Sequence, residues 1–144
     1  MNRKETAVDH YKNGYNCAQA VACTYADVLD MSEEHLFRMM EGFGKGMSFF
    51  GHTCGACTSM VLVTSYLATP DMKTKNAVKN DTYPVIKPMI EQFQKENGYV
   101  DCFDILKHGE PGTCDGKRIC CIHCVEHAID HIEAYRKEQE DGSS

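Results

Sequence analysis

The sequence predicts an all-α protein, folded as a compact bundle of about five to six helices around a buried central helix. Two observations predict this class. Apolar residues recur at helical spacing along most of the 144 residues. Neither a sustained alternation of apolar and polar residues nor an Asn-Gly or Asp-Gly turn between β-branched runs indicates a sheet. We expect a single all-helical domain over residues 1–138 and a disordered polar tail over residues 139–144.

The first half of the chain predicts three helices and a glycine-rich loop. The helices cover residues 4–13, 16–29 and 32–43, and the second and third start at Asn and Ser, residue types that cap helices. Residues 42–52 contain four glycines, which favours a loop. This loop lacks the preceding strand and the Gly-Lys-Ser/Thr ending of a phosphate-binding loop. Its glycines instead indicate a backbone that closely approaches another helix or whatever the neighbouring cysteines hold.

Four more helical segments are predicted in the second half, over residues 53–68, 71–97, 100–107 and 117–137. Apolar residues surround the axis of the first of these segments, which marks it as the central helix. The second contains Pro84 and Pro88, each of which removes an internal hydrogen bond, so we expect a break or kink near Tyr83. Residues 108–116 join the last two helices as a loop.

Composition and charge exclude two classes of partner. The chain carries 21 acidic and 15 basic residues, a formal net charge of −6, and it has no basic stripe of the kind that contacts a phosphate backbone. Nucleic acid is therefore excluded as a partner. The N-terminal residues lack the apolar core of a signal peptide, and no window reaches the length of a membrane span. These features predict a cytoplasmic protein with no membrane partner.

Cysteine content indicates where function lies. The nine cysteines are Cys17, Cys23, Cys54, Cys57, Cys102, Cys114, Cys120, Cys121 and Cys124. An odd number of cysteines in a chain without a secretory signal argues against a disulfide framework and for metal binding or redox thiols. The alternative is packing, because free cysteine is among the most buried residue types.

Helical angle separates the cysteines that face a core from those that do not. Cys17 lies on the apolar stripe of its helix, whereas Cys23 points to the opposite side, and Cys121 lies at the margin of the apolar stripe of the last helix. Cys54 and Cys102 each lie at the start of a helix. We expect Cys17, Cys54, Cys102 and Cys121, the four-cysteine set, to meet in one interior. All but Cys121 lie near a helix N-terminus, where the dipole lowers thiol pKa and favours the reactive thiolate.

The order of the cysteine motifs resembles a known family. The segments GYNCAQAV, GFGKGM with TCGA, DCFDIL and CIHCVEHA follow one another, from residue 14 to about residue 130, as in the C_GCAxxG_C_C family of putative redox-active proteins. The resemblance implies that the four-cysteine set carries the family's cysteines. Cys121 is preferred to Cys120 and Cys124 because Val125 and Ala128 follow it at the family's spacing.

The resemblance also implies a direction for function. The family's suspected role is electron transfer with an iron–sulfur cluster, which implies an unidentified redox partner protein. The family motif around Cys54 ends in glycine, whereas this sequence has Ser59, which is still small enough for close helix packing.

Three chemistries follow from the cysteines. In the first, the four-cysteine set binds an iron–sulfur cluster, for which four thiolates are the usual ligands. In the second, Cys54 and Cys57 act as a catalytic C-x-x-C pair in thiol–disulfide exchange without metal, although no βαβ pattern of a thioredoxin fold surrounds them. A disulfide of Cys54 with another member of the four-cysteine set is an equal alternative. In the third, the set binds zinc as a structural or interaction module, although structural zinc usually takes ligands from two short knuckles.

The last helix carries a further group of candidate metal ligands. Cys120, His123, Cys124, His127 and His131 are predicted to share its polar face. Histidines four residues apart can bind a transition metal with an added sulfur ligand, but a solvated face or a contact in a homodimer is the stronger interpretation. Two other thiols, at positions 23 and 114, are interpreted as incidental.

Overall fold

The computed structural model describes residues 1–73 and 75–142. The helical elements in chain order are α1 (Arg3–Lys12), α2 (Cys17–Cys23), α3 (Glu33–Met40), the 3-10 turn η1 (Glu41–Phe43), α4 (Gly44–Met47), α5 (Gly55–Ala68), α6 (Lys75–Asn97), α7 (Cys102–His108) and α8 (Ile119–Gly142). Two short strands, β1 (Thr113–Cys114) and β2 (Lys117–Arg118), form an antiparallel hairpin between α7 and α8. The predicted all-α class is confirmed.

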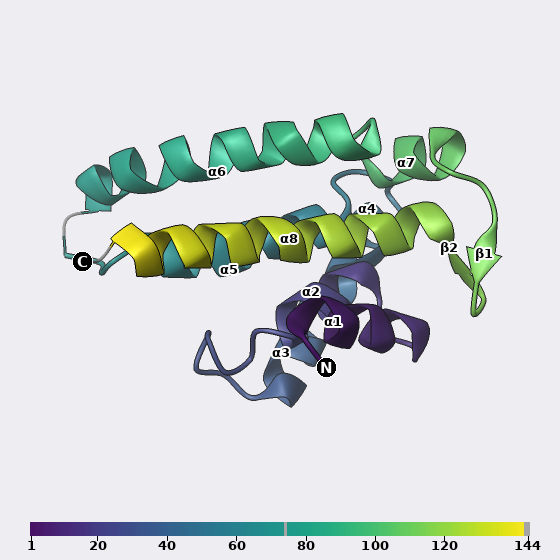
Figure 1. Ribbon diagram of the computed structural model, residues 1–144, viewed down its shortest axis with the longest axis horizontal. Helices are drawn as coiled ribbons and strands as arrows, with labels where there is room; N and C mark the ends of the chain where they lie inside the picture. The colour runs from purple at the N-terminus through teal and green to yellow at the C-terminus, as the bar shows by residue number, and fades with distance from the viewer. Residues whose placement is uncertain (74, 143–144) are drawn as a thin grey trace.

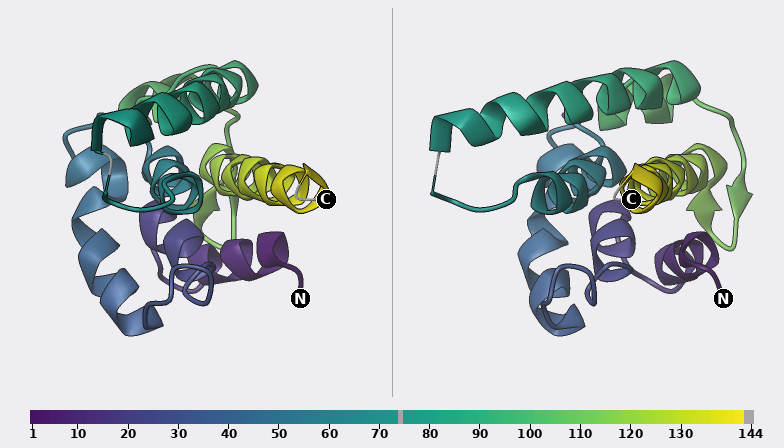
Figure 2. Two further views of the ribbon diagram at one scale, coloured as in Figure 1. Left: turned by 90° about the vertical axis from the view of Figure 1, so that its left-hand side faces the viewer. Right: turned by 60° about the vertical axis from the view of Figure 1, so that its left-hand side comes forward.

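The helices are arranged in three layers, with α5 and α8 side by side in the middle (Figures 1 and 2). Helix α6 covers one side of this pair, and α1, α2 and α3 lie on the other side (Figure 1). Helix α7 and the hairpin close one end of the molecule (Figure 1). The middle layer buries Met60 and Val63 of α5 against Val125, Ile129 and Ile132 of α8 in a continuous apolar core. The surrounding helices pack their own apolar residues against this core.

The predicted central helix is α5, which contacts α2, α6 and α8. It is not buried on all sides, because Tyr66 is 54% exposed. Its sequence is apolar on nearly every face, but its neighbours cover only part of its surface. The expectation of complete burial is therefore wrong for its second half.

Local capping explains the helix starts. Asn16 accepts a hydrogen bond from the Gln19 backbone N–H at 2.8 Å, and the Gln19 side chain accepts one from the Asn16 backbone N–H at 2.9 Å, forming a capping box at the start of α2. Ser32 caps α3 in the predicted way. Helix α2 is shorter than expected and ends at Cys23, after which residues 24–30 form turns.

The predicted break near Tyr83 is wrong, because α6 runs unbroken through Pro84 and Pro88. Both prolines lie on the exposed face of the helix. The carbonyl groups that they leave without a helical partner are therefore open to water. On the opposite face, Ile86 and Phe93 are buried and hold the helix against the core.

Two further differences concern the end of the chain. The loop expected over residues 108–116 contains the first strand of the hairpin, whose turn residues Asp115 and Gly116 both have positive φ, 53° and 77°. This is the backbone conformation for which Asp-Gly turns are favoured. The last helix continues to Gly142, so residues 139–142, expected as a disordered tail, are helical. Residues 143–144 lie outside the described residues.

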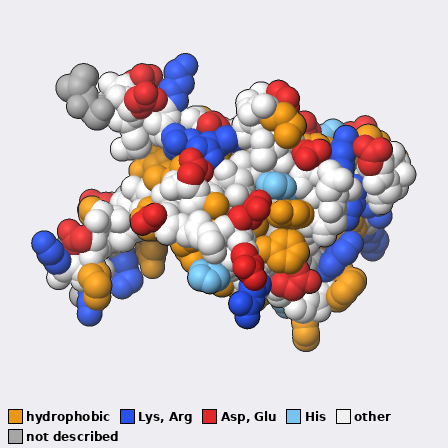
Figure 3. Space-filling view, turned by 90° about the horizontal axis from the view of Figure 1, so that it is seen from below, with side chains coloured by type: hydrophobic (Ala, Val, Ile, Leu, Met, Phe, Trp, Pro, Cys, Tyr) orange, Lys and Arg blue, Asp and Glu red, His pale blue; other side chains and the backbone are white. Residues whose placement is uncertain are grey.

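The surface carries charges of both signs. On the face formed by the lower layer, acidic and basic side chains are interspersed with apolar ones (Figure 3). Over residues 1–73 and 75–142, none of the helices combines the length and apolar character needed to cross a bilayer.

Candidate functional site

Five cysteines line one cavity of about 220 Å³ near the end of the molecule that is closed by α7 and the hairpin. They are Cys17, Cys54, Cys102, Cys121 and Cys124. We call this space the cysteine cavity. Cys17 and Cys102 are the first residues of α2 and α7, Cys54 immediately precedes α5, and the other two lie on α8. The cavity thus brings together the four-cysteine set and one further thiol.

Backbone pairing between two distant segments places Cys54 beside Cys102. The Cys54 N–H donates to the Val100 carbonyl at 2.8 Å, and the Cys102 N–H donates to the His52 carbonyl at 2.6 Å. Thr53 and the residue before Cys102 form an antiparallel bridge between these bonds. This short ladder fixes the starts of α5 and α7 against each other.

Close packing of α5 on α2 places Cys17 beside Cys54. A Cβ atom at Gly55 would lie 2.9 Å from the Ala18 nitrogen and 3.0 Å from the Ala18 Cβ, so this approach requires glycine. Ser59, fully buried, donates a hydrogen bond to the Ala18 carbonyl at 2.7 Å. The residue that departs from the family motif therefore joins the two helices that carry these thiols.

The glycine-rich loop approaches the cavity, as its composition indicated. A Cβ atom at Gly46 would lie 2.7 Å from the Cys102 Cβ. Residues 45–49 all have positive φ, between 54° and 71°, and form a left-handed turn. This conformation costs about 1–2 kcal/mol for each residue other than glycine. Such strain is concentrated at functional sites, and here it places Lys45 in the cavity lining.

The thiols form a chain of contacts within the protein interior. Cys17 contacts both Cys54 and Cys121, Cys54 also contacts Cys124, and Cys121 contacts Cys120. All nine cysteines are free. Each contact joins thiols from different helices, except that between the two adjacent residues of α8. The cavity therefore holds reduced thiols that are close enough to influence one another.

These contacts and burial raise thiol pKa values. For Cys54, contact with Cys124 is the main cause, and burial adds to it against an opposing effect of Cys17. For Cys121, contact with Cys17 and burial both raise the pKa. Contact with Cys121 lowers the pKa of Cys17, but contact with Cys54 and burial outweigh it and raise the pKa overall. The expectation of lowered pKa values at helix N-termini is wrong, because neighbouring thiols in a buried site cannot readily ionise together.

Cys17 and Cys102 are both half-buried, whereas the other three cavity thiols are buried. Burial is the main cause that raises the pKa of Cys102, and the positive charge of Lys45 acts in the opposite direction. Cys102 is therefore the cavity thiol that combines access to solvent with a neighbouring cation.

Cys124 is the cavity residue that sequence reasoning misplaced. It was expected on the polar face of the last helix with Cys120, but the two thiols are 0% and 4% exposed. The error arose because α8 lies between two layers and buries more than one stripe of its surface (Figure 2). The signal that could have found it is the occurrence of three cysteines within five residues, which is unusual on a solvated face.

Two histidines of the last helix contact α6, and the third, His123, lies 3.4 Å from a Glu110 carboxylate oxygen. The His127 Nδ1 lies 2.9 Å from the Asn97 Oδ1, and the His131 Nε2 lies 2.6 Å from a Glu96 carboxylate oxygen. In the part of the chain that the structure describes, no group of three His, Cys, Asp or Glu side chains is arranged to hold a single metal ion. The contacts of His127 and His131 join α8 to the end of α6.

The remaining cysteines lie elsewhere. Cys57 is buried, and burial alone raises its pKa to about 11. Cys23 is also buried, and its Sγ lies 3.7 Å from the Glu33 carbonyl oxygen. Cys114 is exposed on the hairpin. The predicted C-x-x-C pair is thus divided, since only its first cysteine lines the cavity.

The fold and site define a helical protein with reduced cysteines gathered around an internal cavity, a class suited to thiol or metal redox chemistry. The chain belongs to the family described as "Putative redox-active protein (C_GCAxxG_C_C)", whose model matches residues 15–135. This match confirms the resemblance inferred from the sequence. Neither the comparison with curated proteins nor that with solved structures gave a match.

Proposed function

We propose that this protein is an electron-transfer component that binds an iron–sulfur cluster in the cysteine cavity, with the four-cysteine set as ligands. The observation that carries the proposal is the convergence of five cysteines from four helical segments on one cavity. The family's description as redox-active agrees with it. A redox partner protein would supply or accept the electrons.

The donor set fits a cluster. Thiolates are the usual ligands of iron–sulfur clusters. In a [4Fe–4S] cluster each cysteine binds its own iron, and in a [2Fe–2S] cluster two cysteines bind each iron. The four thiols therefore have to surround the cluster rather than meet at one point. The position of all four thiols of the set in the lining of one cavity supports such an arrangement. When bound, the cluster would supply one-electron transfer, and its binding would release the protons that the raised pKa values retain on the thiols.

The test is the metal content of protein purified without oxygen. We expect iron, acid-labile sulfide and broad visible absorption in the parent protein. Cys54→Ser should abolish all three, because this thiol is a proposed ligand that interacts with thiols of both α2 and α8. Cys23→Ser is the matched control, since that thiol is equally buried but lies outside the cavity lining, and it should retain the full iron content.

Two more variants identify the ligand on α8. Both Cys121 and Cys124 line the cavity, and the proposal assigns the ligand to Cys121. Loss of iron in Cys121→Ser with retention in Cys124→Ser would support this assignment, and the reverse would transfer it to Cys124. Protein without iron or sulfide, or iron binding that is indifferent to Cys54→Ser, would contradict the proposed function.

Thiol–disulfide exchange is the second candidate function, favoured by the thiol contacts themselves. Because Cys17 interacts with both Cys54 and Cys121, these two pairs are the candidates for a disulfide within the cavity. The Cys54 and Cys57 pair has less support, since the pKa of Cys57 responds to burial alone. Iron-free protein that forms a reversible disulfide within the cavity would favour this function, whereas stoichiometric zinc would favour a structural or interaction module.

A further inference from the structure

We infer that the mouth of the cysteine cavity is a binding site for a small anion, formed by Lys45, Lys117 and Arg118. The inference rests on the proposed function for the identity of the reactive centre, and it deepens that function by assigning a chemical class to the small molecule that reaches the cavity thiols. The sequence did not indicate this site, because its cations come from two distant segments.

The charge of the lining is the first observation. The three cations line the cavity, and no Asp or Glu is found among its lining residues. The chain as a whole has a net charge of −6, so the positive charge of the cavity lining is opposite in sign to the net charge of the protein. None of the three forms an ion pair with a carboxylate in the part of the chain that the structure describes. The charge of the site is therefore available to a ligand.

The position of the cations is the second observation. Lys45 is exposed and Lys117 and Arg118 are half-buried, whereas Cys54 and Cys121 behind them are buried. The cations thus lie on the solvent side of the thiols. An anion that enters the cavity meets the positive charges before it reaches sulfur, and a concave site with one sign of charge concentrates such ions.

The fold fixes the backbone of Lys45 and contacts the side chains of the other two cations. The left-handed turn over residues 45–49 positions Lys45. The Lys117 Nζ lies 4.9 Å from the centroid of the Tyr11 ring, and Arg118 donates one hydrogen bond to the Leu106 carbonyl at 2.7 Å. The guanidinium group has five N–H donors, so this bond leaves others for a ligand. Positioned cations of this kind form a binding site rather than a diffuse surface charge.

The size of the site selects small molecules. The cavity volume of about 220 Å³ is below the range of about 300–1,000 Å³ that is typical for drug-sized ligands. A carboxylate or oxyanion of few atoms fits such a space, with its charge near the cations and its remaining atoms toward the thiols. A protein surface or a nucleic acid does not enter it.

Charged and neutral alkylating reagents of nearly equal size test the inference. Reduced, metal-free protein is treated with iodoacetate or iodoacetamide, and mass spectrometry follows each cysteine. In both reactions the thiolate sulfur bonds to the CH₂ carbon and iodide leaves. At each cysteine, the rate with iodoacetate is divided by the rate with iodoacetamide, and this ratio is divided by the same ratio in denatured protein. The result, the normalised ratio, is independent of differences in accessibility and in thiolate fraction.

We expect this normalised ratio to exceed one at Cys102 by about three- to tenfold, the effect of a unit charge at a few ångströms in a partly solvated site. At Cys114, which is exposed, lies outside the cavity lining and has Lys12 rather than Lys45 as its neighbouring cation, the ratio should not change in Lys45→Met. Lys45→Met should return the Cys102 ratio toward one. Lys12→Met is the matched control, because Lys12 pairs with Asp115 at 3.4 Å and does not line the cavity, and it should leave the ratio unchanged.

Competition gives an independent measure. At constant ionic strength, inorganic phosphate should slow the reaction of Cys102 with iodoacetate in the parent protein, and this protection should be weaker in Lys45→Met. A normalised ratio near one at Cys102 in the parent, or an elevated ratio retained after Lys45, Lys117 and Arg118 are all changed to Met, would overturn the inference. Circular dichroism and thermal unfolding confirm that each variant is folded.

The outcomes also separate this inference from the proposed function. Iron and sulfide in oxygen-free preparations together with a ratio near one at Cys102 would refute the anion site alone. An elevated ratio in a protein that never contains iron would refute the cluster alone and leave the anion site supported.

Discussion

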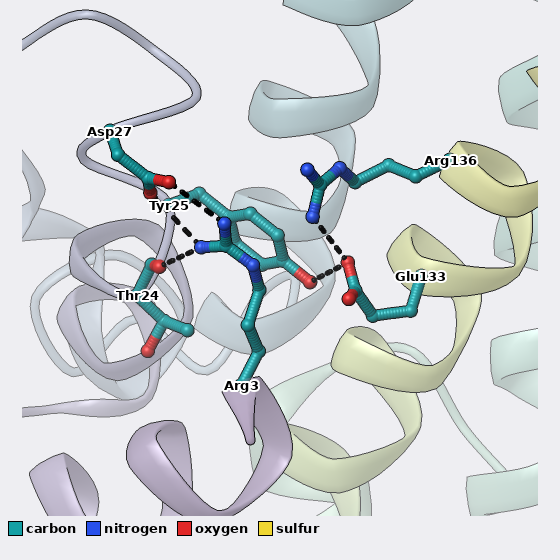
Figure 4. Close-up of polar contacts among 6 residues, drawn as sticks. All are labelled: Arg3, Thr24, Tyr25, Asp27, Glu133 and Arg136. Carbon is teal, nitrogen blue, oxygen red and sulfur yellow. Dashed lines mark hydrogen bonds and ion pairs between the residues drawn. The ribbon is translucent and has the colours of Figure 1, made fainter. Parts of the chain in front are cut away.

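The two halves of α8 differ in how their buried groups are partnered. The first half places Cys120, Cys121 and Cys124 among other thiols. The second half places Glu133 against Tyr25, whose hydroxyl donates to the carboxylate at 3.0 Å (Figure 4). Like groups meet at one end of the helix, and complementary groups meet at the other. We call these regions the thiol end and the polar end.

At the polar end, the charged groups drawn in Figure 4 have opposite or aromatic partners. The Arg3 guanidinium forms two hydrogen bonds to Asp27, at 3.0 and 2.8 Å, and a third to the Thr24 carbonyl at 2.7 Å (Figure 4). Its Cζ also lies 4.8 Å from the centroid of the buried Tyr25 ring. Bidentate pairing of this kind is specific in geometry. This network joins α1, the turn after α2 and α8.

The difference between the ends shows where this fold is specified and where it is left reactive. Matched partners at the polar end favour one arrangement of the helices. At the thiol end, the thiols have raised pKa values and the cations have no carboxylate partners. These thiols can still be oxidised, and these cations can still bind a ligand. The polar contacts that stabilise the fold and the thiols of the proposed site thus lie at opposite ends of α8.

The largest expected effect comes from breaking the polar end. Tyr25→Ala removes a fully buried aromatic ring and should lower the free energy of unfolding by about 4 kcal/mol, the usual cost of truncating a large buried side chain. Urea denaturation of reduced protein measures it. Tyr25→Phe is the matched control and should cost only about 1 kcal/mol, because it removes one hydrogen bond and keeps the packing.

The comparison predicts that alkylation of the cavity cysteines in the folded Tyr25→Ala protein is unchanged. If the substitution cost less than the control, or if it altered the cysteine reactivity pattern at denaturant concentrations where the protein remains folded, the division between the two ends would be wrong.

The next effect concerns pH and Cys57, a buried thiol of α5 that lies outside the cavity lining. Burial raises the pKa of Cys57 from 9.0 to about 11. Above about pH 9 the unfolded chain therefore loses this proton while the folded protein retains it, so the free energy of unfolding falls as pH rises from 9 to 11. Between pH 8 and 10.5 this thiol should account for a fall of about 2 kcal/mol. Denaturation of reduced protein across this range measures the fall.

Cys57→Ala should have a shallower decline with pH than the parent by that amount, whatever its stability at pH 8. Cys114→Ala, which removes an exposed thiol, should decline in parallel with the parent. Parallel slopes for the parent and Cys57→Ala would contradict the assigned cause. The polar end behaves oppositely, because hydrogen bonding to Arg3 lowers the pKa of Asp27 from 3.8 to about 2, so its contribution is present above about pH 4 and is lost as pH falls through 2.

The features that sequence reasoning predicted correctly are local ones. The all-helical class follows from spacing along the chain, and the caps at Asn16 and Ser32 depend on residues three positions apart. Two errors concern the second half of the chain. Pro84 and Pro88 do not interrupt α6, because their face is exposed, and the strands at residue pairs 113–114 and 117–118 are too short to show an alternating pattern.

The same distinction applies to the candidate site. Helical angle and the family pattern were enough to select the four cysteines that the structure brings to one cavity, although their role as ligands stays a prediction. They misplaced Cys124, because a single apolar stripe does not show that α8 is covered on more than one side. They also missed Lys45, whose place in the cavity lining depends on a left-handed turn that no propensity predicts for a lysine.

The smallest expected effect sharpens the comparison at that turn. Lys45 has a φ of 58°, which costs about 1–2 kcal/mol and which glycine adopts freely. Lys45→Gly should therefore raise the free energy of unfolding by about 0.5 kcal/mol, since the greater freedom of glycine in the unfolded chain offsets part of the gain. It should also lose the preference of Cys102 for iodoacetate. Stability would then increase as the chemistry of the thiol end is removed.

Met47→Gly separates the two consequences of that substitution. Met47 lies in the same turn, with a φ of 69° and an exposed side chain, but it carries no charge. Its replacement should give a similar stabilisation, measured by urea denaturation, and keep the iodoacetate preference. If Lys45→Gly destabilised the protein while Met47→Gly stabilised it, the lysine side chain would contribute to folding through contacts of its own. The thiol end would then resemble the polar end, because it too would be stabilised by the groups that give it its chemistry.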